Sequence, residues 1–191
     1  MVRTAILTVL EAGAGGQEDL AAQAVRQVLM SGPFVEVDYH VVPDEQAMIR
    51  ARLRLWAESG NVDLVLTSGG VGLGLKGRTP EATAEVIERA VPGLAEAMRR
   101  ELVREHPEAV LTRGLAGVRR ATLVLNLPGE PAQAKGALQS VVRTGAGPLG
   151  NFRVAATLLA LSCAGLLPPG VSAVPYVAAW RPFLTFRMCL G

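Results

Sequence analysis

Residues 62–83 read VDLVLTSGGVGLGLKGRTPEAT, which predicts a strand, a glycine loop and a helix in that order. The run 62–66 is short and largely apolar, as is typical of a buried strand. Thr79 and Pro80 indicate a helix start, with Thr79 as the N-cap and Pro80 at the first helical position. Glycines allow backbone N–H groups to approach an anion closely, and a helix N-terminus adds a partial positive charge. We therefore expect this loop to bind a phosphate-like group.

Strand and helix signals alternate along the chain on both sides of this unit. Strands are expected at 5–10, 34–42, 62–66 and 121–125, and helices at 17–30, 44–59, 80–90, from 94 to about 104, and 131–142. Strands separated by helices imply a parallel sheet with right-handed crossovers. The predicted fold class is therefore α/β, a doubly wound and mostly parallel sheet flanked by helices.

The expected topology brings several polar segments to one edge of the sheet. Ligands of open α/β sheets bind beyond the carboxyl ends of the strands. The segments that leave the strands at those ends are 10–11, 43–46, 67–76 and 126–129. Two of their side chains also have a purely local interpretation. Asp44 is equally suited to be a helix N-cap, and Asn126 to hydrogen-bond within its own turn.

Two phosphate-binding motifs of other folds do not fit this loop. Residues 72–77 satisfy G-x-G-x-x-G, but that fingerprint belongs to a first strand–helix turn, with its third glycine packed inside the helix start. Here the helix is expected to begin only after Gly77. A Walker A loop needs Gly-Lys followed by Ser or Thr, whereas Lys76 is followed by Gly77 and Arg78.

The composition favours an ordinary intracellular domain. The chain has 191 residues, enough for a sizeable core, and its net charge of +2 gives no argument for a nucleic-acid partner. No signal-peptide pattern precedes the first expected strand, so we expect a cytoplasmic protein. The two cysteines, Cys163 and Cys189, make neither a metal site nor a disulfide framework.

The charge pattern changes after Glu130, the last acidic residue. Up to Glu130 the formal charge is −3, and the remainder carries +5. Such a shift marks a boundary, which we place near Thr144-Gly145. It divides the chain into an α/β ligand-binding domain, 1–145, and a hydrophobic, acid-free extension, 146–191.

The extension contains 27 consecutive residues without charge, 154–180. This length is sufficient to span a bilayer, but Pro168-Pro169-Gly170 divides it into two segments too short to cross as helices. Three interpretations remain: a packed extension, a hairpin on a membrane surface, or translation in a shifted reading frame. We favour an extension packed on the domain or at a subunit contact, and expect no membrane association.

Several stretches accompany the glycine loop in a fixed order. They are LTV (7–9), VPDEQA (42–47), TSGGVG (67–72) with TPEAT (79–83), VPGLAEAMR (91–99) and LNLPGEP (125–131). Together they resemble the molybdopterin adenylyltransferase family, the MogA and MoaB type related to the N-terminal domain of gephyrin. The resemblance covers residues 3–143.

This resemblance implies a molybdopterin-binding α/β domain that acts in molybdenum-cofactor biosynthesis as a homotrimer. The implied reaction joins AMP from ATP to the terminal phosphate of molybdopterin and releases pyrophosphate, with Mg²⁺ as cofactor. Its partners would be molybdopterin and ATP, with neither nucleic acid nor membrane involved.

The resemblance also implies roles for individual residues. Asp44 and Glu11 would take part in the chemistry, and Asp44 would lie near the nucleotide or bind the metal. Loop amides would hold phosphate or pterin, and Asn126 with Gly129 would shape the opposite wall. The implied binding residues are Thr67, Ser68, Gly69, Gly70, Gly72, Lys76, Thr79, Asn126, Pro128 and Gly129.

The chain departs from the family pattern at positions near the expected chemistry. Val71 replaces the threonine of the usual Gly-Gly-Thr-Gly, and Lys76-Gly77 stands where an Arg-Asp pair is normal. Leu10-Glu11 replaces a Ser-Asp, and Ala21-Ala22 a later Ser-Gly. Two hypotheses therefore stand: a working adenylyltransferase, or a degenerate member that binds pterin or nucleotide, or only assembles, without turnover. On the second, Gly77→Asp with Val71→Thr would raise turnover more than affinity.

The proposed boundary can be tested by truncation. Deletion after Arg143 is expected to leave a soluble domain with unchanged ligand affinity, because the sequence places every family motif before that residue. Circular dichroism and ligand titration of the truncated and full chains provide the comparison. Loss of folding or of assembly would show instead that the extension is part of the packed structure.

Overall fold

The computed structural model describes residues 1–10, 19–74 and 76–142. Its elements in chain order are β1 (Val2–Leu10), α1 (Leu20–Leu29), β2 (Phe34–Pro43), α2 (Gln46–Ser59), β3 (Leu64–Ser68), α3 (Thr79–Ala84), β4 (Arg89–Ala90), α4 (Pro92–Leu102), the 3₁₀ turn η1 (Pro107–Leu111), β5 (Ala116–Arg119), β6 (Thr122–Leu127) and α5 (Pro131–Val142).

A six-stranded sheet in the order β2-β1-β3-β6-β5-β4 forms the centre of the domain. The pairings among β2, β1, β3 and β6 are parallel, and those of β5 with β6 and with β4 are antiparallel. The mostly parallel α/β sheet expected from the sequence is thus confirmed. Because four neighbouring strands run the same way, Leu10, Pro43, Ser68 and Leu127 end at one edge, hereafter the carboxyl edge.

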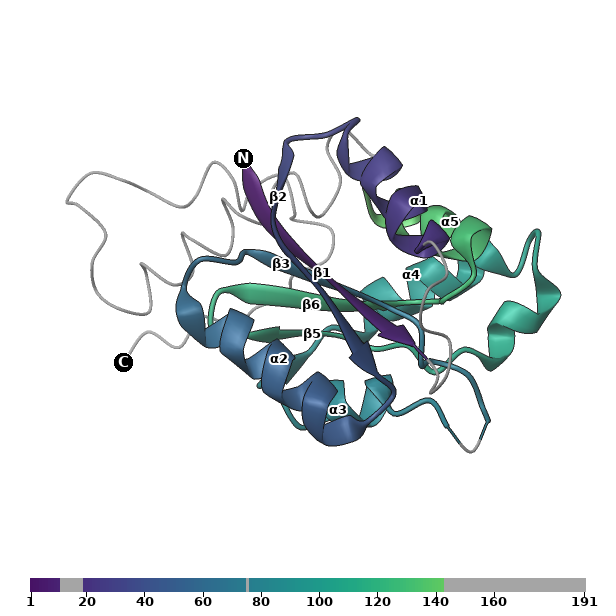
Figure 1. The fold of residues 1–191 in the computed structure, drawn as a ribbon. Helices are drawn as coiled ribbons and strands as arrows, with labels where there is room; N and C mark the ends of the chain where they lie inside the picture. The colour runs from purple at the N-terminus through teal and green to yellow at the C-terminus, as the bar shows by residue number, and fades with distance from the viewer. Residues whose placement is uncertain (11–18, 75, 143–191) are drawn as a thin grey trace, which may run out of the picture.

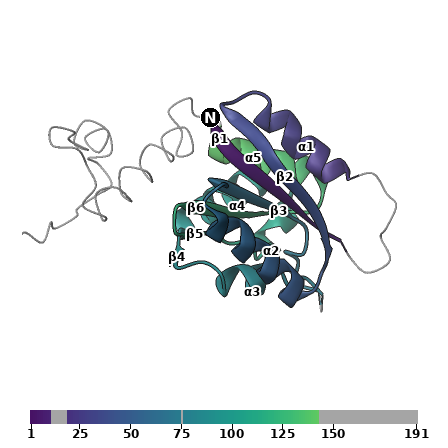
Figure 2. The same ribbon diagram turned by 60° about the vertical axis from the view of Figure 1, so that its left-hand side comes forward.

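Helices cover both faces of this sheet. Figures 1 and 2 show α1, α4 and α5 on one face, and α2 and α3 on the other. Alternate residues of the central strands belong to separate cores. Ile6, Leu66 and Leu125 pack on the α1/α4/α5 side, whereas Val65 and Val124 pack on the α2/α3 side. Burial of both faces explains why these strands read as nearly continuous apolar runs.

The structure corrects the expected start of the helix after the glycine loop. Its N-cap is Arg78, and Thr79 is already helical. The Thr79 hydroxyl does not cap the helix, because it donates to the carbonyl of Gly69, 3.0 Å away. The helix is also shorter than the expected 80–90, since the chain turns after Ala84 and enters β4.

The structure also decides other element boundaries. The alternative interpretation of Asp44 as a helix N-cap does not hold, because Glu45 occupies that position at the start of α2. Strands β4 and β5 and the η1 turn were not predicted. β5 matters for the site: it runs antiparallel to β6, so its first residue, Ala116, pairs with Leu125 close to the carboxyl edge.

The predictions for the C-terminal extension, 146–191, and for its boundary lie outside the described residues. Within the part of the chain that the structure describes, no helix combines the length and apolar character needed to span a membrane.

Leu66 tests the double-sided core. Its side chain is fully buried at the centre of β3, so Leu66→Ala is expected to lower the free energy of unfolding by about 2–5 kcal/mol through lost burial and a residual cavity. Leu55 on α2 is 58% exposed, and Leu55→Ala should change it by less than about 0.5 kcal/mol. Urea denaturation measures both, and similar effects at the two positions would contradict the described core.

Candidate functional site

The glycine loop, residues 69–74 and 76–78, leaves β3 at the carboxyl edge. Gly69 has a φ of +97°, and a Cβ on it would lie 2.4 Å from the carbonyl oxygen of Val9. Only glycine can take this conformation against the neighbouring strand. The first glycine therefore allows the chain to turn directly off β3 beside the end of β1.

The first carbonyls of the loop are bound from inside the fold. Thr79 donates its hydroxyl to Gly69 and its backbone N–H to the carbonyl of Gly70, 3.2 Å away. A trans peptide directs its C=O and its following N–H to opposite sides, so the N–H groups of Gly70 and Val71 point away from Thr79. Among the described residues neither N–H has a hydrogen-bond partner. Successive free amides of this kind form an anion-binding concavity.

Asp44 closes the far end of the loop. Its carboxylate accepts the backbone N–H of Gly77 at 2.6 Å and that of Arg78 at 2.8 Å. It also lies against the start of the loop, since a Cβ on Gly70 would be 3.3 Å from its Oδ1. Asp44 therefore sits at the glycine loop, as predicted, and holds its two ends close together.

The side chain of Asn126 has a structural role within the fold. Its side chain is buried and donates to the hydroxyls of Thr67 and Thr83, at 3.0 and 2.9 Å. Its Oδ1 accepts the N–H of Leu115 at 3.1 Å. Both amide protons are thus used internally, and Asn126 joins β6 to β3, to α3 and to the segment before β5.

The Pro-Gly turn after β6 packs on the glycine loop. The N–H of Gly69 donates to the carbonyl of Leu127 at 3.2 Å, and the hydroxyl of Ser68 donates to the carbonyl of Pro128 at 3.3 Å. A Cβ on Gly129 would lie 3.1 Å from the Cα of Gly69. The glycine loop and the turn 128–129, which were expected to form opposite walls of the site, are therefore in contact where they leave β3 and β6.

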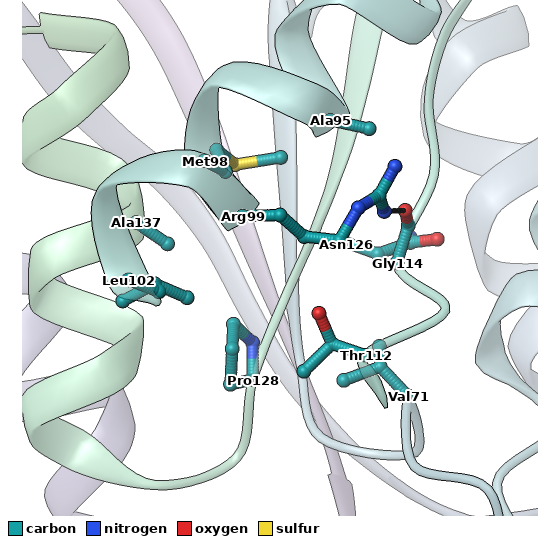
Figure 3. Close-up of a pocket in the computed structure, with 10 residues that line it drawn as sticks. All are labelled: Val71, Ala95, Met98, Arg99, Leu102, Thr112, Gly114, Asn126, Pro128 and Ala137. Carbon is teal, nitrogen blue, oxygen red and sulfur yellow. Dashed lines mark hydrogen bonds between the residues drawn. The ribbon is translucent and has the colours of Figure 1, made fainter. Parts of the chain in front are cut away.

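A small hollow, with a cavity volume of about 10 Å³, lies between this turn, the glycine loop and α4 (Figure 3). In the figure, Arg99 of α4 reaches toward Gly114 and donates to its carbonyl at 3.1 Å. The lining residues are Val71, Ala95, Met98, Arg99, Leu102, Thr112, Gly114, Asn126, Pro128 and Ala137.

The structure brings together most, but not all, of the predicted site residues. Of the predicted residues, Asn126 and Pro128 line the pocket of Figure 3, whereas Asp44 is not among its lining residues. Val71, which was not predicted as a site residue, also lines it. Lys76 is exposed beside the loop. Glu11 lies outside the described residues.

The fit of the site to a metal ion depends on Asp44. Within the described ranges, no group of three or more His, Cys, Asp or Glu side chains could hold a metal. Each oxygen of Asp44 accepts one N–H and keeps a further lone pair. Mg²⁺ commonly uses one or two carboxylates together with substrate phosphates. The residues present therefore fit Mg²⁺ only as an ion shared with phosphate groups.

Sequence reasoning missed Arg113 and Glu81, which form an ion pair beside the loop. Burial is the largest influence on the Glu81 carboxyl and by itself would raise its pKa. The hydrogen bond from Arg113, a backbone hydrogen bond and the positive charges of Arg113 and Arg78 together lower that pKa below its ordinary value. The available signal was the apolar run 115–118, shortly before β6. This run indicates a strand that pairs antiparallel with β6. Such a strand begins at the carboxyl edge, so Arg113, which precedes it, lies at that edge.

The structure also changes the expectation for an aspartate at position 77. Gly77 has a φ of +102°, and a Cβ there would lie 3.2 Å from the carbonyl oxygens of both Gly70 and Gly72. Any side chain at this position meets backbone strain. Restoring the family's carboxylate at 77 therefore requires the loop itself to change shape.

Comparison with known proteins gives consistent matches. Residues 5–146 match the family model described as "Probable molybdopterin binding domain". The chain is 38% identical over 133 residues to the molybdopterin adenylyltransferase of Helicobacter pylori strain J99, covering 68% of this chain and 75% of that protein. The enzyme of the same name from Escherichia coli K12 is 37% identical over 133 residues, covering 68% of each chain.

Solved structures agree with this result. The molybdopterin biosynthesis enzyme MoaB from Thermus thermophilus superposes with a TM-score of 0.72 at 46% identity, covering 84% of this chain and 97% of that one. A MogA structure superposes with a TM-score of 0.71 at 31% identity, covering 81% and 99%.

Paired glycine substitutions test the loop conformation. Gly77→Ala is expected to destabilise the fold by about 1–3 kcal/mol, because a Cβ is strained at a φ of +102°. Gly72 has no atom within 4 Å of an added Cβ and no positive φ, so Gly72→Ala should cost less than about 1 kcal/mol. Thermal and urea denaturation measure both. Equal costs would contradict the described loop.

Proposed function

The chain belongs to the family of molybdopterin-binding domains, and from this premise we propose that it is a molybdopterin adenylyltransferase of molybdenum-cofactor biosynthesis. It would transfer AMP from ATP to the terminal phosphate of molybdopterin and release pyrophosphate. The observation that carries this proposal is the glycine loop at the carboxyl edge, between Asp44 and the Pro-Gly turn, where the N–H groups of Gly70 and Val71 have no partner among the described residues.

The residues present suit a reaction between phosphate groups. The oxygen of one phosphate attacks the α-phosphorus of ATP, the bond to the β-phosphate oxygen breaks, and pyrophosphate carries away the electron pair. Such a transfer needs alignment and charge neutralisation more than a covalent intermediate. The amides of Gly70 and Val71 supply hydrogen bonds from the backbone, with no side chain to reorganise as the reaction proceeds.

Asp44 would hold the loop closed during this reaction. It binds the N–H groups of Gly77 and Arg78 and so keeps the end of the loop near its start. Mg²⁺ bound to the substrate phosphates would neutralise their charge, and Asp44 is the residue that would share it. Lys76 is an exposed residue of the loop and would add a positive charge to it.

One observation favours a second candidate, a family member that binds its ligand without turnover. Gly77 stands where the family has an aspartate, and the strain of a Cβ at this position opposes any carboxylate in the loop as it is folded here. The binding amides belong to the backbone and are unaffected by this loss. Affinity would then survive better than turnover.

The resemblance carries two further proposals, that the protein is a homotrimer and that it acts in the cytoplasm. Sedimentation of the full chain tests the first of these. Three copies would give one species at three times the monomer mass of 20.1 kDa.

Adenylyl transfer by the purified full chain tests the proposed function. With molybdopterin, ATP and Mg²⁺, we expect release of pyrophosphate and formation of adenylylated molybdopterin. Asp44→Asn should lower kcat/KM by about 10²–10³, because it removes the charge and one acceptor of the loop N–H pair. The matched control is Glu45→Gln, since Glu45 is exposed and makes no side-chain cap. Binding without transfer would support the second candidate, and neither binding nor transfer would refute both.

A further inference from the structure

Arg113 contacts the glycine loop at several points. Its Nε donates to the carbonyl of Gly72 at 2.9 Å, and its Nη2 to that of Gly77 at 2.6 Å. Its Nη1 is hydrogen-bonded to Glu81, in the first turn of α3. Its backbone N–H donates to the carbonyl of Val71 at 2.9 Å. A single residue from outside the loop thus engages the loop's middle, its end and the helix that follows.

The backbone of Arg113 is itself fixed by the sheet. Leu115, two residues later, donates its N–H to the side chain of Asn126 at 3.1 Å and accepts the N–H of Asn126 at 2.9 Å. β5 then starts at Ala116, paired with Leu125. Because β5 runs antiparallel to β6, the chain reaches Arg113 at the carboxyl edge, where the loop lies.

The contacts of Arg113 determine which way the loop amides face. The carbonyls of Val71 and Gly72 point toward Arg113, so the N–H groups of Gly72 and Leu73 point away from it. Thr79 fixes the two preceding peptides in the same manner. Among the described residues the N–H groups of Gly70, Val71 and Gly72 have no hydrogen-bond partner, so they are free for an anion.

Gly77 is held from both sides. Its N–H donates to Asp44, and its carbonyl accepts from Arg113. A glycine-rich segment has large conformational freedom, and fixing it costs entropy. Asp44 and Arg113 restrict that freedom before any ligand arrives.

We propose that Arg113 is the positioning residue of the glycine loop: it clamps the carbonyls of Val71, Gly72 and Gly77 so that the loop amides are set to receive a phosphate group of the substrate. This inference rests on the proposed function for the identity of the substrate. The clamp itself is a property of the fold and can be tested without it.

The clamp requires arginine and not merely a positive charge. The planar guanidinium directs Nε, Nη1 and Nη2 to separate acceptors at fixed angles. A lysine carries one nitrogen on a flexible stem and cannot span two carbonyls and a carboxylate in this way. The carboxylate of Glu81, on α3, balances the positive charge of Arg113 and fixes the orientation of its guanidinium.

Hydrogen exchange of the ligand-free full chain tests the clamp. In Arg113→Lys we expect the hydrogen-bonded amides of Gly77, Arg78 and Thr79 to exchange at least about tenfold faster than in the wild type, because the loop opens more often. The matched control is Arg119→Lys. Arg119 likewise donates to a backbone carbonyl, that of Val86 at 3.0 Å, and to Glu58 at 2.6 Å, away from the loop. Unchanged loop exchange in Arg113→Lys, or equal acceleration in both variants, would overturn the proposal.

Kinetics separate positioning from a general loss of folded protein. Arg113→Lys is expected to raise the KM for the substrate held by the loop about tenfold, with a smaller change in kcat. A merely structural role would lower the active fraction, and so kcat, and leave KM unaltered; that result would overturn positioning. If the wild type shows no adenylyl transfer, the proposed function fails, and the exchange comparison alone decides whether the clamp exists.

Discussion

The parallel pairing of β1, β3 and β6 is the constraint on which the site depends. β3 lies between the other two and is buried on both faces, so its end cannot move without them. Gly69 turns off β3 against the carbonyl of Val9 and donates to Leu127. The position of the glycine loop is therefore set by backbone contacts on both neighbouring strands before any side chain contributes.

Side chains from separate segments then fix the shape of the loop. Thr79 binds its first carbonyls, Asp44 the N–H groups at its end, and Arg113 the carbonyls between. The result is a loop in which the carbonyls of residues 69–72 are hydrogen-bonded, while the N–H groups of Gly70, Val71 and Gly72 have no partner among the described residues. These contacts to the loop backbone do not need a side chain at Gly77, so the proposed anion-binding geometry is compatible with a glycine at that position.

Much of this arrangement could be predicted, because parallel strands and glycine loops leave local signals. The carboxyl edge and the approach of Asp44 to the loop follow from strand order and from the VPDEQA and TSGGVG stretches. The contact of Arg113 was not predicted, because it depends on β5 running antiparallel, and a purely parallel interpretation assigns no strand to the apolar run 115–118. The internal role of Asn126 was also inaccessible, because its partners Thr67 and Thr83 meet it only in the folded sheet.

The antiparallel hairpin of β5 and β6 gives the loop an unusual dependence on distant parts of the chain. Arg113 and Asp44 lie more than thirty positions from their loop partners on either side. The loop is thus tied to segments that precede and follow it in the chain, and its shape depends on both being in place. Fraying of the sheet at its β4–β5 margin would disrupt the site while the central strands remained intact.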